Sequence, residues 1–323
     1  MNIITDEIDF ENYFAENQDE GAKVRPASQW CDEVIDRVFG QSAQNNWTPI
    51  GFSKAAGNFD LRIGEVTAWA GVNGNGKTTF LSHTMLNVMA SGQKVCLASL
   101  EMKPRDSMFK MTLQALGLPN PSAAFIRAFH KWTDSRLWVY DHLGRVAASR
   151  MLAVATYVRK ELGVDHLVID SLMKCGIGPE DYAAQKDFVD GLCALARDTG
   201  LSIHLVCHMR KGENERQAPG KFDVKGAGEI TDLIDNLVII WKNQTKQPSK
   251  PGEAIDTSKP DAYVRVAKQR HHSWEGSFAF WFDKASQQFL ENERARPQCL
   301  HDLNRVQLHE QPVQFVDEPA EFL

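Results

Sequence analysis

The chain has 323 residues, 43% of them hydrophobic, and its 36 Lys and Arg against 42 Asp and Glu give a formal net charge of -6. That length supports one large core, and the acidic balance excludes a protein that coats nucleic acid with a uniformly basic surface. The six cysteines form no CxxC pair and no zinc-ligand spacing, which argues against a disulfide framework and a thiolate metal site. The acidic N-terminus and the lack of an apolar run of roughly 20 residues favour a cytoplasmic protein without membrane contact.

Composition divides the chain into four parts. Residues 1–24 are predicted to form a flexible tail, because seven acidic side chains and no basic one precede Lys23. Within residues 25–45, apolar side chains at helical spacing predict an amphipathic helix whose apolar face needs a partner. Residues 46–292 are predicted to form the folded domain, and residues 293–323 a second acidic tail.

Short apolar runs alternate with amphipathic segments through the predicted domain. The apolar runs predict strands at 66–70, 95–99, 137–140, 166–170, 202–207 and 236–241. The amphipathic segments predict helices at 77–90, 104–116, 147–162 and 182–199. This alternation is typical of an α/β fold, in which a mostly parallel twisted sheet carries helices on both faces. Two later segments, YVRVAKQR and SFAFWFD, alternate with period two and predict antiparallel strands at the sheet edge.

The stretch GVNGNGKTT lies between the first strand and the first helix of this series and matches the phosphate-loop pattern GxxxxGK[ST]. Lys77 is expected to reach the outer phosphates of ATP or another NTP or dNTP, and the Thr78 hydroxyl to bind Mg²⁺. The order of strand, loop and helix argues against a chance glycine-rich turn. The residues expected to bind the nucleotide are Gly71, Asn73, Gly74, Asn75, Gly76, Lys77, Thr78 and Thr79.

Polar residues follow three other predicted strands. Asp170 ends HLVID and is expected to bind the metal, whereas Glu101 follows VCLAS and is expected to orient and deprotonate water. His208 follows SIHLVC and is a candidate sensor of the γ-phosphate. Ligands of parallel sheets gather at the carboxyl ends of strands, which favours these roles. The residues alone also permit structural roles, as a cap, a first-turn acid and a hydrogen-bonded histidine.

Residues 210–229 form a long, glycine-rich and charged connection between two predicted core strands, and loops of that length are usually functional or disordered. Acidic side chains nearly balance its basic ones, so the charge by itself also permits a solvated surface loop. The candidate DNA-binding residues of this loop are Arg210, Lys211, Lys221 and Lys225.

Lys268 and Arg270 occupy alternate positions at the end of a predicted strand, so both side chains lie on one face. Two cations that point the same way suit a triphosphate, and an arginine donated by a neighbouring subunit would make hydrolysis depend on assembly. The alternative is a basic edge strand that discourages aggregation.

Taken together, the motifs GVNGNGKTT, SLEM, VIDS, VCHMR, DVKGAGEI and VAKQR resemble the RecA-like ATPase domain of hexameric replicative helicases. This is the DnaB-like superfamily, superfamily four, and the likeness over about residues 25–290 is closest to its phage-type and Twinkle-like branch. The resemblance implies a homo-oligomeric ring, usually of six subunits, that encircles single-stranded DNA at a fork. Such a ring hydrolyses NTP to move 5′ to 3′ and unwind duplex DNA, in the cytoplasm of a bacterium or a phage-infected host.

The resemblance also assigns roles to the residues described above. It makes Glu101 the catalytic base, Asp170 a metal ligand and His208 a phosphate sensor. Lys268 and Arg270 would reach the neighbour's nucleotide. The loop at 210–229 would line the pore, where repeated lysines would bind DNA phosphates without reading sequence, so that binding weakens with salt.

The chain also departs from the family pattern. Only about 25 residues precede the helix at 28–39, which corresponds to the linker helix that docks on an adjacent subunit, so we expect no primase domain and no self-priming. His208 follows the phage-type branch, whereas bacterial members usually have glutamine there.

Two other functions remain open from the sequence. One is a RecA-like or RadA-like ATPase that coats single-stranded DNA as a recombination filament, and the other is a loader or accessory ATPase that uses nucleotide as an assembly switch. The ending VDEPAEFL is either a solubility tail or a docking segment for a polymerase, primase or single-strand-binding protein.

Overall fold

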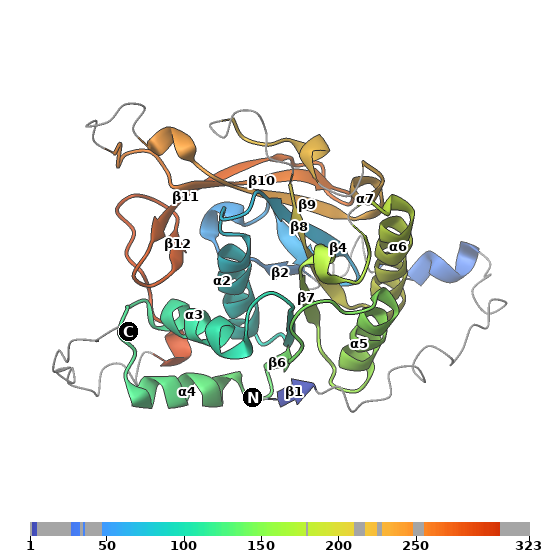
Figure 1. Cartoon of the computed structure of the whole chain (residues 1–323), viewed down its shortest axis with the longest axis horizontal. Helices are drawn as coiled ribbons and strands as arrows, with labels where there is room; N and C mark the ends of the chain where they lie inside the picture. Colours follow the sequence, from blue (N-terminus) through green and yellow to red (C-terminus); the bar gives the residue numbers. More distant parts are fainter. Residues whose placement is uncertain are drawn as a thin grey trace.

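The computed structural model of the chain describes residues 2–4, 27–32, 35, 47–178, 180–209, 217–224, 228–247 and 255–303. Among these residues, one mixed sheet has the strand order β1-β6-β5-β7-β8-β4-β9-β10-β11-β12 (Figure 1). Its parallel strands are β1 (Asn2–Ile4), β4 (Val66–Gly71), β5 (Val95–Ser99), β6 (Leu137–Tyr140), β7 (His166–Asp170), β8 (Ser202–His208) and β9 (Asn236–Lys242). The predicted fold class is confirmed, and the predicted central strands agree with the observed ones to within one residue at each end.

Helices cover both faces of the sheet, so alternate residues of each central strand pack into two different cores. On β4, Ala68 and Ala70 pack into the core beneath α5, α6 and α7, whereas Trp69 packs into the core beneath α2, α3 and α4 (Figure 1). The helices are α2 (Lys77–Ala90), α3 (Pro104–Leu116), α4 (Ala123–Thr133), α5 (Ala148–Lys160), α6 (Tyr182–Thr199) and α7 (Gly228–Leu233). Both faces of the central strands are therefore buried, which explains their continuous apolar sequence.

Three antiparallel strands complete one edge of the sheet, and the period-two patterns predicted the first two of them. They are β10 (Ala262–Gln269), β11 (Gly276–Asp283) and β12 (Gln288–Leu290). A separate two-stranded sheet consists of β2 (Trp47–Pro49) and β3 (Asp60–Arg62). Short 3-10 helices lie at Ala27–Trp30, Ser53–Ala55, Leu172–Lys174, Lys221–Asp223 (η7), Gln244–Lys246 and His301–Leu303 (η9).

The ends of the chain are described only in part. Asn2–Ile4 form β1, which pairs with β6, and the rest of the expected acidic tail lies outside the described residues. The same holds for most of the expected linker helix. At the other end, the folded part continues past residue 292, since Asp302 of η9 accepts a hydrogen bond from Trp132 of α4 at 2.9 Å. None of the described helices has the length and apolar character needed to cross a bilayer.

Candidate nucleotide-binding site

The loop between β4 and α2 has the backbone geometry of a phosphate cradle. Gly74 and Gly76 have φ angles of 81° and 84°, in the left-handed region that glycine adopts without strain. A Cβ atom on Gly71 would lie 2.5 Å from the carbonyl oxygen of Ile240, so the close approach of β9 also requires glycine there. Because α2 begins at Lys77, the loop ends at a helix N-terminus, where N–H groups and the helix dipole attract an anion.

Lys77 lies inside this loop. Its side chain is buried, and Nζ donates hydrogen bonds to the carbonyl oxygens of Gly71 at 2.9 Å and Val72 at 3.2 Å. Burial lowers the pKa of Lys77, and the carboxylates of Asp170 and Glu101 raise it. An ammonium held by neutral carbonyls gains a charge-assisted bond when a phosphate oxygen replaces them, so the loop fits a nucleotide.

The other predicted nucleotide-binding residues surround Lys77. Asn73 and Gly74 are exposed at the outer part of the loop, and Asn75 is half-buried behind them. Thr79 is buried in the first turn of α2. All of them therefore belong to the one loop and helix start that the motif indicated.

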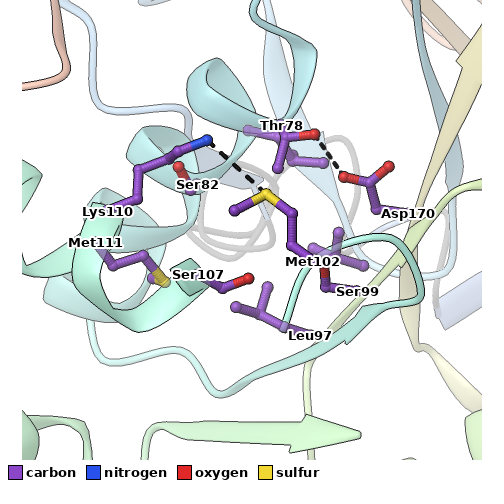
Figure 2. A pocket seen from close by; sticks show the side chains of 11 residues that line it. Thr78, Ser82, Leu97, Ser99, Met102, Ser107, Lys110, Met111 and Asp170 are labelled. Carbon is purple, nitrogen blue, oxygen red and sulfur yellow. Dashed lines mark hydrogen bonds between the residues drawn. The ribbon is translucent and has the colours of Figure 1, made fainter. Parts of the chain in front are cut away.

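Thr78 and Asp170, the two residues predicted to bind the metal, lie together beside the phosphate loop, and this part of the site is called the metal side. The hydroxyl of Thr78 donates a hydrogen bond of 2.6 Å to Oδ2 of Asp170, which joins the first turn of α2 to the end of β7 (Figure 2). Burial raises the pKa of the Asp170 carboxyl, and the hydrogen bond from Thr78 opposes that shift. Two hard oxygen donors beside a phosphate loop fit Mg²⁺, which usually takes one or two protein ligands together with phosphate and water oxygens.

Glu101, Ser171 and His208 meet where β5, β7 and β8 end. The Ser171 hydroxyl donates a hydrogen bond of 2.8 Å to Oε1 of Glu101. Nε2 of His208 lies 3.6 Å from that carboxylate oxygen and 3.3 Å from Oγ of Ser171. The Glu101 side chain is 37% exposed, so it reaches water while Ser171 holds its direction. Sequence reasoning identified Glu101 and His208 but missed Ser171, although this hydroxyl directly follows Asp170.

Comparisons with known proteins agree with this geometry. Residues 58–214, which include the phosphate loop, match the AAA_25 family, described as an AAA domain. The ATPase domain of G40P matches with a TM-score of 0.67 and 17% identity, over 83% of this chain and 99% of that one. A DnaB-like replicative helicase, solved in a study of its interactions with primase, matches with a TM-score of 0.65 and 16% identity, over 83% of this chain and 67% of that one. Residues 58–214 are therefore similar to an AAA domain, and the chain has the fold of these two structures.

A curated relative also matches this chain. The DNA helicase/primase of Enterobacteria phage T3 is 26% identical over an alignment of 209 residues, and the match covers 57% of this chain and 36% of the relative. The chain therefore spans about a third of the length of that relative. The predicted resemblance to the DnaB-like ATPase domain is confirmed.

Lys268 and Arg270 lie together at the C-terminal end of α7. Nζ of Lys268 donates to three carbonyl oxygens within residues 231–234, at 2.7, 2.8 and 2.9 Å. Nη2 of Arg270 donates to two carbonyl oxygens of the same segment at 2.7 and 2.8 Å, and Nε lies 3.3 Å from Asp235. Cations at this position stabilise the negative end of a helix. These contacts lie within one protomer, so a role at a neighbour's nucleotide stays a prediction.

The charged loop at 210–229 is described only in part. Arg210, Lys211 and Lys225 lie outside the described residues. Lys221 is exposed in η7, and its Nζ lies 5.3 Å from the ring centroid of Phe222, which is 80% exposed. A backbone bridge pairs Met209 with Val224, so the ends of the loop are tied together one residue after His208.

A pocket adjoins the metal side of the site and holds about 410 Å³ of empty space, open solvent included (Figure 2). Its wall comes from α2, α3, β5 and β7, and it includes Thr78 and Asp170. Lys110 of α3 also lines it, a cation that sequence reasoning missed because it lies in mid-helix, outside every motif.

Proposed function

We propose that this chain is the motor of a ring-forming replicative DNA helicase that hydrolyses NTP, moves 5′ to 3′ on single-stranded DNA and unwinds duplex DNA. The observation that carries the proposal is the placement of the Glu101–Ser171–His208 cluster beside the Thr78–Asp170 pair, at one edge of the sheet. The names of the phage T3 relative and of the DnaB-like structure support the same assignment.

The residues of the cluster have distinct roles in this proposal. Glu101 orients the attacking water and accepts its proton, and the hydrogen bond from Ser171 keeps the carboxylate in place. His208 lies beside the Ser171 hydroxyl and contacts the γ-phosphate in this proposal. Loss of that contact after hydrolysis would change the conformation of the loop that begins two residues later. Thr78 and Asp170 would hold Mg²⁺, which would supply positive charge against the negative charge that develops on the phosphate.

Assembly completes the proposed site. Arg270 of one subunit would exchange the carbonyl oxygens at the end of α7 for the neighbour's γ-phosphate. Lys221, exposed on the charged loop, would contact DNA phosphates in the pore together with Arg210, Lys211 and Lys225. Repetition of these cations around a ring, expected to have six subunits, would concentrate positive potential that one acidic chain does not show.

The acidic C-terminal tail is proposed to contact a polymerase, a primase or a single-strand-binding protein. Its last acidic residues lie outside the described part of the chain, and the proposal rests on composition. We propose that the protein acts in the cytoplasm of a bacterium or of an infected host.

Unwinding of a forked DNA duplex tests the function. Wild type should unwind the fork with NTP and Mg²⁺, whereas Glu101→Gln should bind nucleotide and DNA yet unwind at least about 100-fold more slowly, because it lacks the base. Glu161→Gln, which changes an exposed glutamate after α5, is the matched control and should behave as wild type. Wild-type protein that coats single-stranded DNA as filaments and does not unwind would overturn the proposal in favour of a recombination ATPase.

A further inference from the structure

Lys110 is a cation that the proposed mechanism does not use. It lies on α3 and faces the first turn of α2, where its Nζ is 3.3 Å from the hydroxyl oxygen of Thr79. The same Nζ is 4.0 Å from the sulfur of Met102 (Figure 2). Both of these partners are neutral. Burial lowers the pKa of Lys110, and the charge of Asp170 raises it, so the ammonium interacts electrostatically with the carboxylate proposed to bind the metal.

The walls of the pocket bring Lys110 and Asp170 to one space. Both residues line it, and so does Thr78 of α2. Ser99 and Ser107 also line it, and each has a buried hydroxyl oxygen without a hydrogen-bond partner among the described residues. The space beside the metal side therefore brings an ammonium and a carboxylate to one pocket whose accessible lining is mainly apolar, so little water separates the two charges.

The charge of Lys110 has opposite effects on the two ligands of the nucleotide site. Asp170 is 6% exposed, and the Thr78 hydroxyl that bonds to it is neutral, so the positive charges of Lys77 and, to a smaller extent, Lys110 stabilise the carboxylate. The same charge attracts nucleotide phosphates and repels a second cation that arrives between Thr78 and Asp170. In a partly buried site this interaction is screened much less than at the surface.

We propose that the ammonium of Lys110 is a built-in cation of the metal side, which offsets the charge of Asp170 before Mg²⁺ binds and sets the Mg²⁺ concentration at which the site fills. Lys110 is a positioning residue in this scheme and does not touch the reacting atoms. The inference rests on the proposed nucleotide site and does not require DNA unwinding.

The test measures equilibrium binding of a fluorescent, non-hydrolysable ATP analogue without DNA, as a function of Mg²⁺ concentration. Lys110→Met keeps the length of the side chain and removes the charge. We expect Lys110→Met to reach half-saturation at about fivefold lower Mg²⁺ and to bind the analogue about fivefold more weakly in EDTA, both from the loss of one unit charge. A loss of packing alone would weaken binding in both measurements, whereas the loss of charge should lower the Mg²⁺ requirement and weaken binding of the analogue in EDTA.

Two further variants make the result specific. Lys110→Arg retains the charge and should keep the Mg²⁺ requirement of wild type. Lys103→Met removes an exposed lysine just before α3 and serves as the matched control, with no shift expected. Thermal unfolding without ligand establishes that each variant is folded, and if Lys110→Met does not fold, Lys110→Gln takes its place.

An unchanged Mg²⁺ requirement in the folded, uncharged variant would overturn the inference, as would a shift in Lys110→Arg equal to that in Lys110→Met. Failure of the proposed function has a different signature. Wild type that binds the analogue in a Mg²⁺-dependent manner but does not unwind DNA would overturn the helicase proposal and leave the role of Lys110 standing.

Discussion

The phosphate loop and the Lys268–Arg270 pair both hold cations against backbone carbonyl oxygens, but the two regions differ in where those oxygens come from. Lys77 is 6% exposed and contacts carbonyl oxygens five and six residues earlier in its own loop. The Arg270 side chain is 38% exposed and contacts carbonyl oxygens of α7, 37 and 38 residues earlier. Lys77 is thus placed by local chain geometry, whereas Arg270 is placed by the packing of β10 beside α7 and presents part of its charge to solvent.

Lys268 and Arg270 also differ from each other in how many of their N–H donors are used within their own chain. A lysine ammonium has three N–H donors, and the three carbonyl contacts of Lys268 use all of them. A guanidinium has five N–H donors, of which Arg270 directs those of Nη2 and Nε to α7 and Asp235. Arg270 can therefore approach a second subunit at lower cost than Lys268, and Lys268 ties β10 firmly to the helix that follows the charged loop.

Arg270→Ala gives the largest expected effect and tests whether this region acts on a neighbour. The NTPase rate of the assembled protein with single-stranded DNA should fall by about a thousandfold, because the transition state loses a donated positive charge. Nucleotide binding by the dilute, unassembled protein should change by less than about twofold, because Arg270 contacts α7 and Asp235 in its own chain. Steady-state turnover and fluorescent-nucleotide binding measure the two quantities.

Asp235→Asn is the matched control for Arg270→Ala. It weakens the ion pair with Arg270 but keeps an acceptor for the backbone N–H of Val66, which bonds to Oδ2 of Asp235 at 2.9 Å. Turnover by this variant should stay within about threefold of wild type, since a partly exposed ion pair contributes little. Full turnover by isolated wild-type protomers would show that the comparison between the two regions is mistaken.

Lys77→Met gives the next largest effect and acts in a single protomer. Affinity for nucleotide should fall by about 100-fold, because a charge-assisted bond to phosphate is lost inside a buried loop. Fluorescent-nucleotide titration of dilute protein measures it, and Lys131→Met, an exposed position on α4, is the control. An affinity loss confined to the assembled ring would contradict the conclusion that this region is complete within one chain.

Low pH should destabilise the phosphate loop and the Lys268–Arg270 region together, because both belong to the sheet that carries the buried pair of His166 and His204. Nε1 of Trp69 donates to Nδ1 of His204, so neutral His204 carries its proton on Nε2 and donates it to Nδ1 of His166, 3.0 Å away. Burial lowers the pKa of His166 to about 4, below its ordinary 6.5. The unfolded chain therefore binds a proton that the folded chain excludes as pH falls from 6.5 towards 4.

Stability should be highest above pH 6.5 and should decline by up to about 1.4 kcal/mol per pH unit from His166 alone within that window. Denaturant unfolding followed by tryptophan fluorescence and by circular dichroism measures the decline. His166→Asn, which does not titrate there, should flatten the profile. Two separate transitions, in place of one shared by both probes, would show that the regions do not rest on one cooperative sheet.

Much of the fold follows from local patterns, and one clear miss shows where such patterns fail. The predicted helices at 77–90, 104–116 and 182–199 have the observed bounds of α2, α3 and α6. Helix α4 was not predicted, because its buried aromatic residues have low helix propensity and their partner is distant in sequence. Trp132 packs there and bonds to Asp302, 170 residues later.

The sequence by itself determined the phosphate loop, since glycines with positive φ, a strand end and a helix start are properties of one short segment. It also placed Glu101, Asp170 and His208 after apolar strands, which indicates a sheet edge but not which strands are neighbours. Only the tertiary structure decided that Ser171 and His208 meet Glu101 and that Lys110 faces Thr79, because the order β5-β7-β8-β4 is not the order along the chain. Apolar patterns determine which residues are buried, whereas strand order is decided by how the helices pack between them.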